Sequence, residues 1–410
     1  MRGSNAIAVT RDASELSSRV AAFPASLTEA LIVVPVKNHP PQRAQRARRK
    51  HREQTPDLPK GTSRFRRALL AWYDQNRRDL PWRRTRDPYA IWLSEIMLQQ
   101  TRVAAVLDHY RIFLERFPNV AALAAASEDA VLAAWSGLGY YRRARMLHQC
   151  AREIVKRYGG RFPENSAALL ALPGIGRYTA AAIASIAFGE PIGVVDGNVE
   201  RVLERVAGSN LTVRQCWERA QGLLPKPRPG DFNQAMMELG ATVCLPREPR
   251  CPACPIRRWC ETRQPASLRY LRAKDLRAND LRANDLPVHG VRADPRAKVS
   301  PRQNKREIWC ALERRDGHVR LVKRPRTASL MAGMWELPQW EELPHASAKA
   351  AHWRTFRHSI TVTDYTVHVL RDWKNGKVPP GRGKWVAIEK IPELPITGLT
   401  RKVLKAGGII

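Results

Sequence analysis

Four cysteines near the middle of the chain constrain its fold more than any other feature. Cys244, Cys251, Cys254 and Cys260 are spaced C-x6-C-x2-C-x5-C, close enough for their thiolates to bind one metal centre. Zinc and a cubane iron–sulfur cluster both accept four thiolates, but structural zinc sites commonly pair two C-x2-C units, and this segment contains one. The spacing therefore favours an iron–sulfur cluster and leaves zinc as the alternative.

The composition points to an anionic partner. The 410 residues include 70 Lys and Arg against 38 Asp and Glu, a formal net charge of +32. Arg247, Arg250, Arg257 and Arg258 lie within the cysteine segment itself, so the loops around a metal would also present cations. Such a balance favours nucleic acid over small neutral ligands, although a merely basic soluble protein would share it.

The cysteines also bear on the compartment. The chain has seven cysteines; four are assigned to the metal, and the others fall in apolar stretches where buried thiols are common. This pattern is typical of a reduced intracellular protein rather than of a disulfide framework. No run approaches the ~20 apolar residues of a membrane span, and the N-terminus lacks a secretory signal pattern. We therefore expect a soluble, cytoplasmic monomer that is associated with the nucleoid and not with a membrane.

Changes in residue pattern divide the chain into four segments. Residues 1–60 are rich in Arg and weakly periodic, which predicts a basic flexible tail. Residues 61–265 repeat apolar side chains at helical spacing and predict a helical domain. Residues 266–304 carry a tandem five-residue repeat and predict a linker. Residues 305–410 have the shorter period of strands and predict a small α+β domain.

Within the last segment the elements follow from local patterns. Apolar and β-branched residues at 307–313 and 318–323 flank Asp316-Gly317, a dipeptide typical of a hairpin turn. A second β-branched run covers residues 361–370, and a final helix is expected at about 397–405.

A glycine-containing turn, Leu172-Pro-Gly-Ile-Gly176, separates an apolar helix (Ala167–Ala171) from a second helix that starts near Tyr178. Gly174 and Gly176 allow the backbone to bend sharply and to direct N–H groups outward at a helix start, which suits a phosphate. The segment resembles the helix-hairpin-helix motif of DNA repair proteins. An ordinary turn between packed helices is the alternative.

Glu95 lies in the run from Ile91 to Thr101, where Ile91, Trp92 and Leu98 share its helix face. An apolar setting should raise the pKa of this carboxyl, and a carboxylic acid that stays protonated near neutrality can act as a general acid. A helix carboxylate that reaches water is the alternative. Gln99, Gln100 and Thr101 end this helix with groups able to enter a base stack and to hydrogen-bond to base edges.

Asp196 precedes Gly197-Asn198 and an amphipathic run, which predicts a helix N-cap. A second interpretation is an ionised carboxylate that faces positive charge developing on a sugar. One protonated and one ionised carboxyl are what the breaking of a glycosidic bond through an oxocarbenium-like state requires. The two interpretations of Asp196 are compatible.

Several motifs together carry a resemblance to a known family. They are Leu80-Pro-Trp-Arg83, the run from Leu93 to Thr101, Gly137-Leu-Gly-Tyr-Tyr141, the glycine turn, Val195-Asp-Gly-Asn198 and the cysteine segment. From about residue 64 to 265, and more weakly from 305 to 405, the chain resembles the adenine DNA glycosylases of the MutY type. The resemblance implies a mostly α helix-hairpin-helix glycosylase core with an iron–sulfur cluster loop, followed by a C-terminal α+β Nudix/MutT-like domain.

The resemblance also implies roles for individual residues. Glu95 would protonate adenine, Asp196 would stabilise the sugar cation, and the four cysteines would bind a [4Fe–4S] cluster. The substrate would be adenine opposite 8-oxoguanine or guanine in double-stranded DNA. The residues expected to contact substrate are Trp82, Arg83, Gln100, Thr101, Leu138, Tyr140, Tyr178 and Glu238, of which Gln100, Leu138 and Tyr140 would form the wedge beside the opposing base. Gly174 and Gly176 would contact the DNA backbone.

Tyr178 bears on the type of glycosylase. Related endonuclease III enzymes carry a lysine after the last arginine of the hairpin, whereas Tyr178 follows Arg177 here. The amine that would form a Schiff base is missing, which favours a monofunctional enzyme over a bifunctional glycosylase and AP lyase. A non-catalytic iron–sulfur DNA-binding protein is the other alternative, and it gives no reason for both Glu95 and Asp196.

The C-terminal segment departs from its relatives at two places. Gly333-Met-Trp-Glu-Leu-Pro338 resembles a Nudix fold, but the downstream metal-binding box is absent, so nucleotide hydrolysis is not expected there. In the loop that senses 8-oxoguanine the family commonly has Phe-Ser-His, whereas this chain has Phe356, Arg357 and His358. A long cation replaces a small hydroxyl, which leaves lesion discrimination by these residues open.

Overall fold

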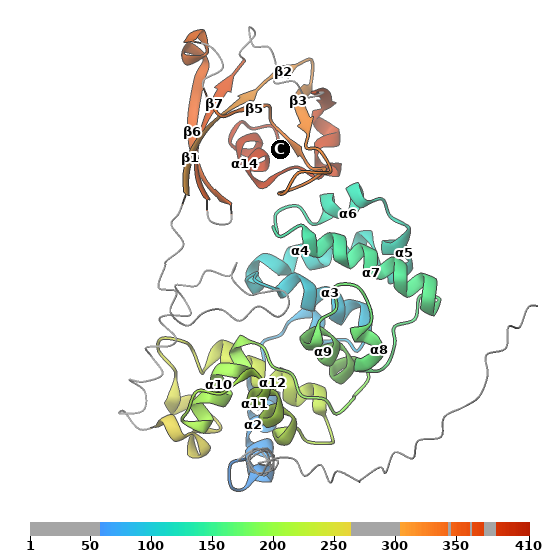
Figure 1. Cartoon of the computed structure of the whole chain (residues 1–410), viewed down its shortest axis with the longest axis vertical. Coiled ribbons are helices and arrows are strands. Elements are labelled where there is room, and N and C mark those ends of the chain that lie inside the picture. Colours follow the sequence, from blue (N-terminus) through green and yellow to red (C-terminus); the bar gives the residue numbers. More distant parts are fainter. Residues whose placement is uncertain (1–57, 264–303, 343–345, 361–362, 373–382) are drawn as a thin grey trace, which may run out of the picture. The chain divides into compact units, whose positions relative to one another are not determined.

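The structure, a computed structural model, describes residues 58–263, 304–342, 346–360, 363–372 and 383–410. Residues 58–263 form a helical part and residues 304–410 contain the strands (Figure 1), and each part is described by itself. The predicted tail, except residues 58–60, and the predicted linker, except Asn304, lie outside the described residues.

The helical part confirms the helical periodicity of the sequence. Phe65, Leu69 and Tyr73, spaced four apart, are all fully buried on one helix face. The helices in chain order are α2 (Thr62–Asn76), η1 (Pro81–Arg83), α3 (Pro88–Leu98), α4 (Val103–Arg116), α5 (Val120–Ala125), α6 (Glu128–Ala134), α7 (Arg142–Tyr158), α8 (Ser166–Leu170), α9 (Arg177–Ala187), α10 (Gly197–Ala207), α11 (Val213–Leu223), α12 (Pro229–Thr242), η2 (Cys251–Ala253), η3 (Arg257–Trp259) and η4 (Glu261–Arg263).

Two hydrophobic clusters divide these helices into two lobes. Lobe 1 is built from residues 80–194, with Trp92 and Trp135 fully buried among its helices. Lobe 2 is built from α2 together with α10, α11 and α12, where Leu69 and Leu239 belong to one cluster. The first helix of the part therefore packs with the last ones, although more than a hundred residues separate them in the sequence.

The C-terminal part contains two small sheets and one longer helix. The elements are β1 (Asn304–Leu312), β2 (Arg314–Arg315), β3 (His318–Lys323), β4 (Trp335–Glu336), β5 (Gln339–Trp340), η5 (Ala346–Ala351), β6 (His352–Ile360), β7 (Thr363–Arg371), β8 (Lys384–Ala387), η6 (Ile388–Glu393) and α14 (Gly398–Ala406). One sheet has the order β5-β1-β7-β6; the other has the order β2-β3-β4, with β8 also paired to β3. Val367, Val369 and Leu404 share the core between sheet and helix.

The predicted elements of this part are confirmed, with one difference in pairing. Asp316 and Gly317 have φ angles of 47° and 71° and form the two-residue turn between β2 and β3, as both φ signs require in such a hairpin. The run that begins at residue 307 does not pair with β3, however. Its strand, β1, pairs with β7 in parallel. This pairing buries Cys310 and Leu312 in the same core as Val367 and Val369.

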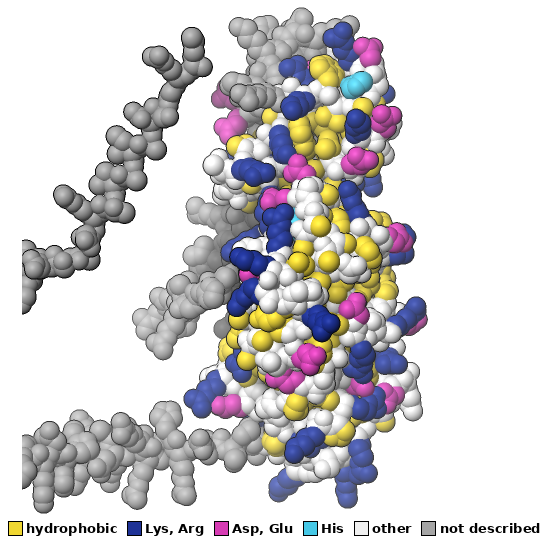
Figure 2. Space-filling view, turned by 90° about the vertical axis from the view of Figure 1, so that its right-hand side faces the viewer, with side chains coloured by type: hydrophobic (Ala, Val, Ile, Leu, Met, Phe, Trp, Pro, Cys, Tyr) yellow, Lys and Arg dark blue, Asp and Glu magenta, His cyan; other side chains and the backbone are white. Residues whose placement is uncertain are grey.

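Basic side chains are spread over the visible surface in Figure 2, with hydrophobic and acidic side chains between them, rather than gathered in one patch. Among the helices of the described residues, none has the length and apolar character needed to cross a membrane.

Candidate active site

A cavity of about 1100 Å³ lies in the helical part and is lined by residues of both lobes. It brings together nearly all the residues predicted to act on substrate: Trp82, Arg83, Glu95, Gln100, Thr101, Tyr140, Gly174, Tyr178, Asp196 and Glu238 line it. Its volume is slightly above the usual range for ligand sites, about 300–1000 Å³. Residues more than 150 positions apart in the sequence therefore share one site.

Glu95 lies in the middle of α3 and is almost fully buried, with 8% of its surface exposed. Tyr178 of α9 donates a hydrogen bond from its hydroxyl to Glu95 Oε2 at 2.7 Å. Burial raises the pKa of Glu95 to about 7; the Tyr178 hydrogen bond opposes this, and the nearby charge of Asp196 adds to it. The alternative of a solvated carboxylate is wrong, and Glu95 is poised to hold or release a proton near neutral pH.

Tyr178, the residue after Arg177, places a phenol hydroxyl next to Glu95. Its hydroxyl lies between Glu95 and Met237, whose Sδ is 3.3 Å away. Burial raises the pKa of Tyr178 well above its ordinary value, so the phenol stays a neutral donor. The predicted difference from lyases is thus a phenol, and not an amine, in direct contact with the general-acid candidate.

Asp196 is the N-cap of α10, and the predicted cap is confirmed. Its Oδ1 accepts from the Val199 N–H at 2.7 Å, and its Oδ2 accepts from Asn198 Nδ2 at 3.0 Å. Burial raises the pKa of Asp196, while these hydrogen bonds and the positive charge of Arg201 favour the carboxylate. The cap also orients the carboxylate, because Asp196 lines the same cavity as Glu95.

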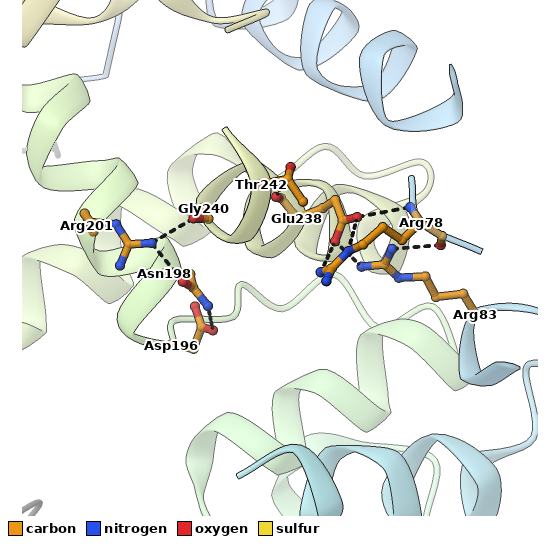
Figure 3. Close-up of polar contacts among 8 residues, drawn as sticks. All are labelled: Arg78, Arg83, Asp196, Asn198, Arg201, Glu238, Gly240 and Thr242. Atoms are coloured by element: carbon orange, nitrogen blue, oxygen red, sulfur yellow. Dashed lines mark hydrogen bonds and ion pairs between the residues drawn. The ribbon is translucent and has the colours of Figure 1, made fainter. Parts of the chain in front are cut away.

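Arg201 ties Asp196, through Asn198, to Gly240 of α12 (Figure 3) and also contacts Cys244. Its Nη2 donates to Asn198 Oδ1 and to Gly240 O, both at 2.8 Å, and its Nε donates to Cys244 O at 2.9 Å. Asn198 in turn donates to Asp196. Neither Asn198 nor Arg201 was predicted as a site residue from the sequence; both lie within five residues of Asp196, and this proximity was the available signal.

On another wall of the cavity, Glu238 is fully buried and binds two arginines (Figure 3). Arg78 reaches both of its oxygens, at 2.8 and 2.7 Å, and Arg83 Nη2 donates to Oε2 at 2.7 Å. Burial disfavours the charged form, but the hydrogen bonds from Arg78 and Arg83 outweigh it and lower the pKa of Glu238 to about 2. Arg78 was missed in the sequence because nothing local distinguishes it from Arg77.

The glycine turn joins α8 to α9 as predicted, and its two glycines differ. Gly174 has φ 78°, and a Cβ there would lie 2.8 Å from Met146 Cβ, so a side chain is excluded both by conformation and by space. Gly176 has φ −89° and caps α9, and a Cβ there would meet no described atom within 4 Å. The open space before the first N–H groups of α9 suits an anion.

The predicted wedge residues divide into two groups. Gln100 and Tyr140 line the cavity, and Tyr140 is 44% exposed. Leu138 is only 6% exposed and packs in the core of lobe 1. The wedge role of Leu138 stays a prediction, and its side chain is buried in the described structure.

The four cysteines lie in the short turns that follow α12. Burial raises the pKa of the Cys254 thiol to about 12, and Cys244, Cys260 and Cys251 are near enough to raise it further. Arg205 contacts two of the four: its Nη1 lies 3.3 Å from Cys244 Sγ, and its carbonyl oxygen lies 3.3 Å from Cys260 Sγ. All four are free thiols, although within the described residues no group of three or more His, Cys, Asp or Glu side chains is arranged to hold a metal ion.

These thiols fit a thiolate-bound cofactor by their chemistry. Four sulfur donors in one compact loop suit soft metal centres, and the Arg205 guanidinium compensates negative charge on the sulfurs. Arg257 and Arg258 line a shallow pocket next to Cys254, so the same turns present cations at the surface.

In the C-terminal part, the prediction that Phe356, Arg357 and His358 form a loop is wrong. They lie in the middle of β6, paired with Val367, Thr366 and Tyr365 of β7. Phe356 is 8% exposed and belongs to the core, whereas Arg357 is exposed. Because successive side chains of a strand point to opposite faces, Arg357 and His358 cannot contact the same base from one side of the sheet.

Comparison with known proteins identifies two families along the chain. Residues 93–226 match a family described as HhH-GPD superfamily base excision DNA repair protein, and residues 308–406 match the NUDIX domain. The two matches confirm the predicted fold class of a helical core followed by a Nudix domain.

Individual relatives agree with these matches. The human adenine DNA glycosylase is 38% identical over 402 residues, which cover 83% of this chain and 73% of the human protein. The mouse adenine DNA glycosylase is 44% identical over 309 residues, 67% of this chain and 60% of that protein. Among solved structures, a thermostable thymine-DNA glycosylase is 35% identical and has a TM-score of 0.47, with 49% of this chain and 95% of that chain covered.

Proposed function

This chain belongs to the adenine DNA glycosylase family, and we propose that it excises adenine paired with 8-oxoguanine or guanine from double-stranded DNA. It is a monofunctional base excision repair enzyme that acts on the N-glycosidic bond of adenine. The observation that carries the proposal is the pairing of buried Glu95, with a pKa near 7, and capped Asp196 in one cavity.

The chemistry follows from the two carboxyl groups. Once adenine has left the base stack, Glu95 donates its proton to the adenine ring as the bond between base and sugar breaks, and the bonding electron pair leaves with the base. The sugar is left as an oxocarbenium ion, which the Asp196 carboxylate stabilises. Water adds its oxygen to the sugar carbon and loses a proton, which restores protonated Glu95. The products are neutral adenine and an abasic site.

The polar wall opposite supports recognition rather than proton transfer. Glu238 stays ionised, because its pKa lies near 2, and it fixes the guanidinium of Arg83 in the cavity. A fixed guanidinium donates to acceptor nitrogens of a purine without competing with Glu95 for its proton. Trp82 adds an apolar wall for the base.

A [4Fe–4S] cluster held by Cys244, Cys251, Cys254 and Cys260 completes the proposal. When bound, the cluster would order the turns that carry Arg257 and Arg258, which would contact DNA phosphates. Purified protein should contain iron and acid-labile sulfide; zinc without iron would overturn the cluster. Replacement of Cys251 should reduce DNA affinity before it reduces the excision rate of bound substrate.

Residues 305–410 form a domain that would read the base opposite adenine, with Arg357 on the exposed face of β6 as the side chain able to do so. Because the proposed substrate is genomic DNA, we propose that the enzyme acts in the cytoplasm in association with the nucleoid. Truncation near Pro301 should therefore leave adenine excision and reduce the preference for 8-oxoguanine over guanine. Unchanged preference would refute this role.

The direct test incubates the protein with duplexes that carry adenine opposite 8-oxoguanine, guanine or thymine. Strand breaks that appear only after alkali, and only with the first two duplexes, are expected. Breaks without alkali would indicate a lyase, and no breaks with intact DNA binding would indicate a non-catalytic DNA-binding protein. The Glu95→Gln variant is the control for contaminating nucleases.

A further inference from the structure

Arg143, at the start of α7, lies where the end of α3 meets the loop before α7. Its Nη1 donates to the carbonyl oxygens of Ile96, Met97 and Gln99, at 2.9, 2.9 and 2.5 Å. Its Nη2 donates to Thr101 Oγ1 at 3.1 Å. The carbonyls at a helix end carry partial negative charge, so the cation caps the C-terminus of α3.

The same guanidinium also holds the second loop. Its Nη2 lies 3.3 and 3.4 Å from the carbonyl oxygens of Leu138 and Gly139. Gly139 O accepts a further hydrogen bond from Trp135 Nε1 at 3.1 Å, and the guanidinium lies over the Trp135 and Tyr140 rings at 5.3 and 5.5 Å. Burial lowers the pKa of Arg143 to about 10, which leaves it charged at neutral pH.

The residues between these hydrogen bonds are the two surface side chains of the wedge. Gln100 and Tyr140 have φ angles of 55° and 47°, in the left-handed region that residues with a side chain rarely adopt. Such conformations persist where the surroundings hold them. Arg143 bonds to the residues on both sides of Gln100 and to the two residues before Tyr140, so it constrains both at once.

We propose that Arg143 is a positioning residue that joins the two loops, so that Gln100 and Tyr140 enter the base stack as one preorganised unit. The inference rests on the proposed function, because it concerns extrusion of adenine from a duplex. A fork with two nitrogens, each serving several acceptors, is required; a lysine keeps the charge but cannot bond both loops with the same geometry.

The distinguishing substrate pair is a duplex with adenine opposite 8-oxoguanine and a duplex with an unopposed, bulged adenine. In the paired duplex the wedge must replace the stacking that is lost when adenine leaves the helix. In the bulged duplex the adenine has no opposing base, so the wedge has no such base to hold in place. Arg143→Lys should lower the single-turnover rate and the affinity on the paired duplex by roughly tenfold to a hundredfold. On the bulged substrate the change should stay below about threefold on the same scale.

Extrusion itself is followed with 2-aminopurine next to the target adenine, in the inactive Glu95→Gln background. Arg143→Lys should reduce the fluorescence increase on binding. Arg152→Lys is the matched control, because Arg152 is exposed on the same helix and its hydrogen bond within the described residues is a long one, 3.4 Å, to Ala124 O. It should behave like the parent protein in all three measurements.

A double-mutant cycle between Arg143 and the wedge residues distinguishes a positioning role of Arg143 from a general structural role. If Arg143 acts through the wedge, Arg143→Lys should have little further effect in a Gln100→Ala, Tyr140→Ala protein. If Arg143→Lys does not fold, Thr101→Val removes one acceptor of the guanidinium and should show a several-fold version of the same selective loss. Equal losses on both substrates, full additivity, or no loss on the paired duplex would each overturn the inference. Failure of the wild type to excise adenine would instead overturn the proposed function.

Discussion

Tyr178→Phe isolates the hydrogen bond that Tyr178 donates to Glu95. The contact is 2.7 Å long and buried, and it favours the ionised form of Glu95 because the phenol can only donate to the carboxylate. A hydrogen bond to a charged group contributes roughly 1.5–3 kcal/mol, which corresponds to roughly one to two pKa units. The pKa of Glu95, about 7 in the wild type, should therefore rise in the variant.

The assay is the pH dependence of kcat/KM, measured with substrate well below KM, which reports the free protein. A general acid must be protonated, so activity falls as pH rises through its pKa, and the falling limb should move to higher pH by roughly one to two units in Tyr178→Phe. Tyr89→Phe is the matched control: it loses a buried 2.7 Å hydrogen bond to Phe117 O outside the cavity. In Tyr89→Phe the falling limb of the pH profile should stay at the wild-type pH, while the free energy of unfolding decreases. An unmoved limb in Tyr178→Phe, or one at lower pH, would refute the assignment of Glu95 as the titrating acid.

Three further outcomes are expected. Glu95→Gln should abolish excision and keep duplex binding. Burial raises the pKa of Glu95 from 4.5 to about 7 in the folded protein, so the free energy of unfolding of the wild type should fall by about 3 kcal/mol relative to the variant as the pH rises across that interval. Denaturant unfolding measures this difference, and a difference that does not change with pH would contradict the prediction. Asp196→Asn should reduce the single-turnover rate ~10²-fold or more with little loss of stability, since Asn caps helices as well as Asp; loss of stability with normal turnover would mark Asp196 as a cap alone. Arg357→Ser should weaken binding to 8-oxoguanine duplexes alone, as the proposed reading of the opposing base requires; weaker binding to every duplex, with a salt slope lower by roughly one, would instead mark a phosphate contact.

Local spacing was sufficient to predict parts of the site. The apolar neighbours of Glu95 at helical spacing indicated its burial, and the residues after Asp196 indicated its cap, because both effects act within one or two helical turns. The two glycines of the glycine turn likewise predicted the turn between α8 and α9.

Contacts between distant segments could not be predicted in the same way. Arg143 serves main-chain carbonyls some forty residues away, and a carbonyl is the same in every residue, so no side chain in the sequence marks its partner. Arg77 and Arg78 both follow the end of α2, and it is Arg78 whose main chain and side chain contact Glu238. The expected loop at Phe356 was wrong for a related reason: burial is a property of the packed chain, and an apolar side chain suits both a recognition loop and a core strand.

The way lobe 2 is assembled affects how the chain folds during synthesis. Of the helices in lobe 2, α2 emerges from the ribosome before the others, and α10 begins roughly 120 residues later, an interval of roughly 6–24 s at ordinary rates of elongation. During that time lobe 1 can fold, while the apolar face of α2 has no packing partners and remains accessible to chaperones. A nascent chain that stops before α12 contains Glu95 but lacks the wall of the cavity that carries Met237 and Glu238, so the site is complete only with the last helices of the part.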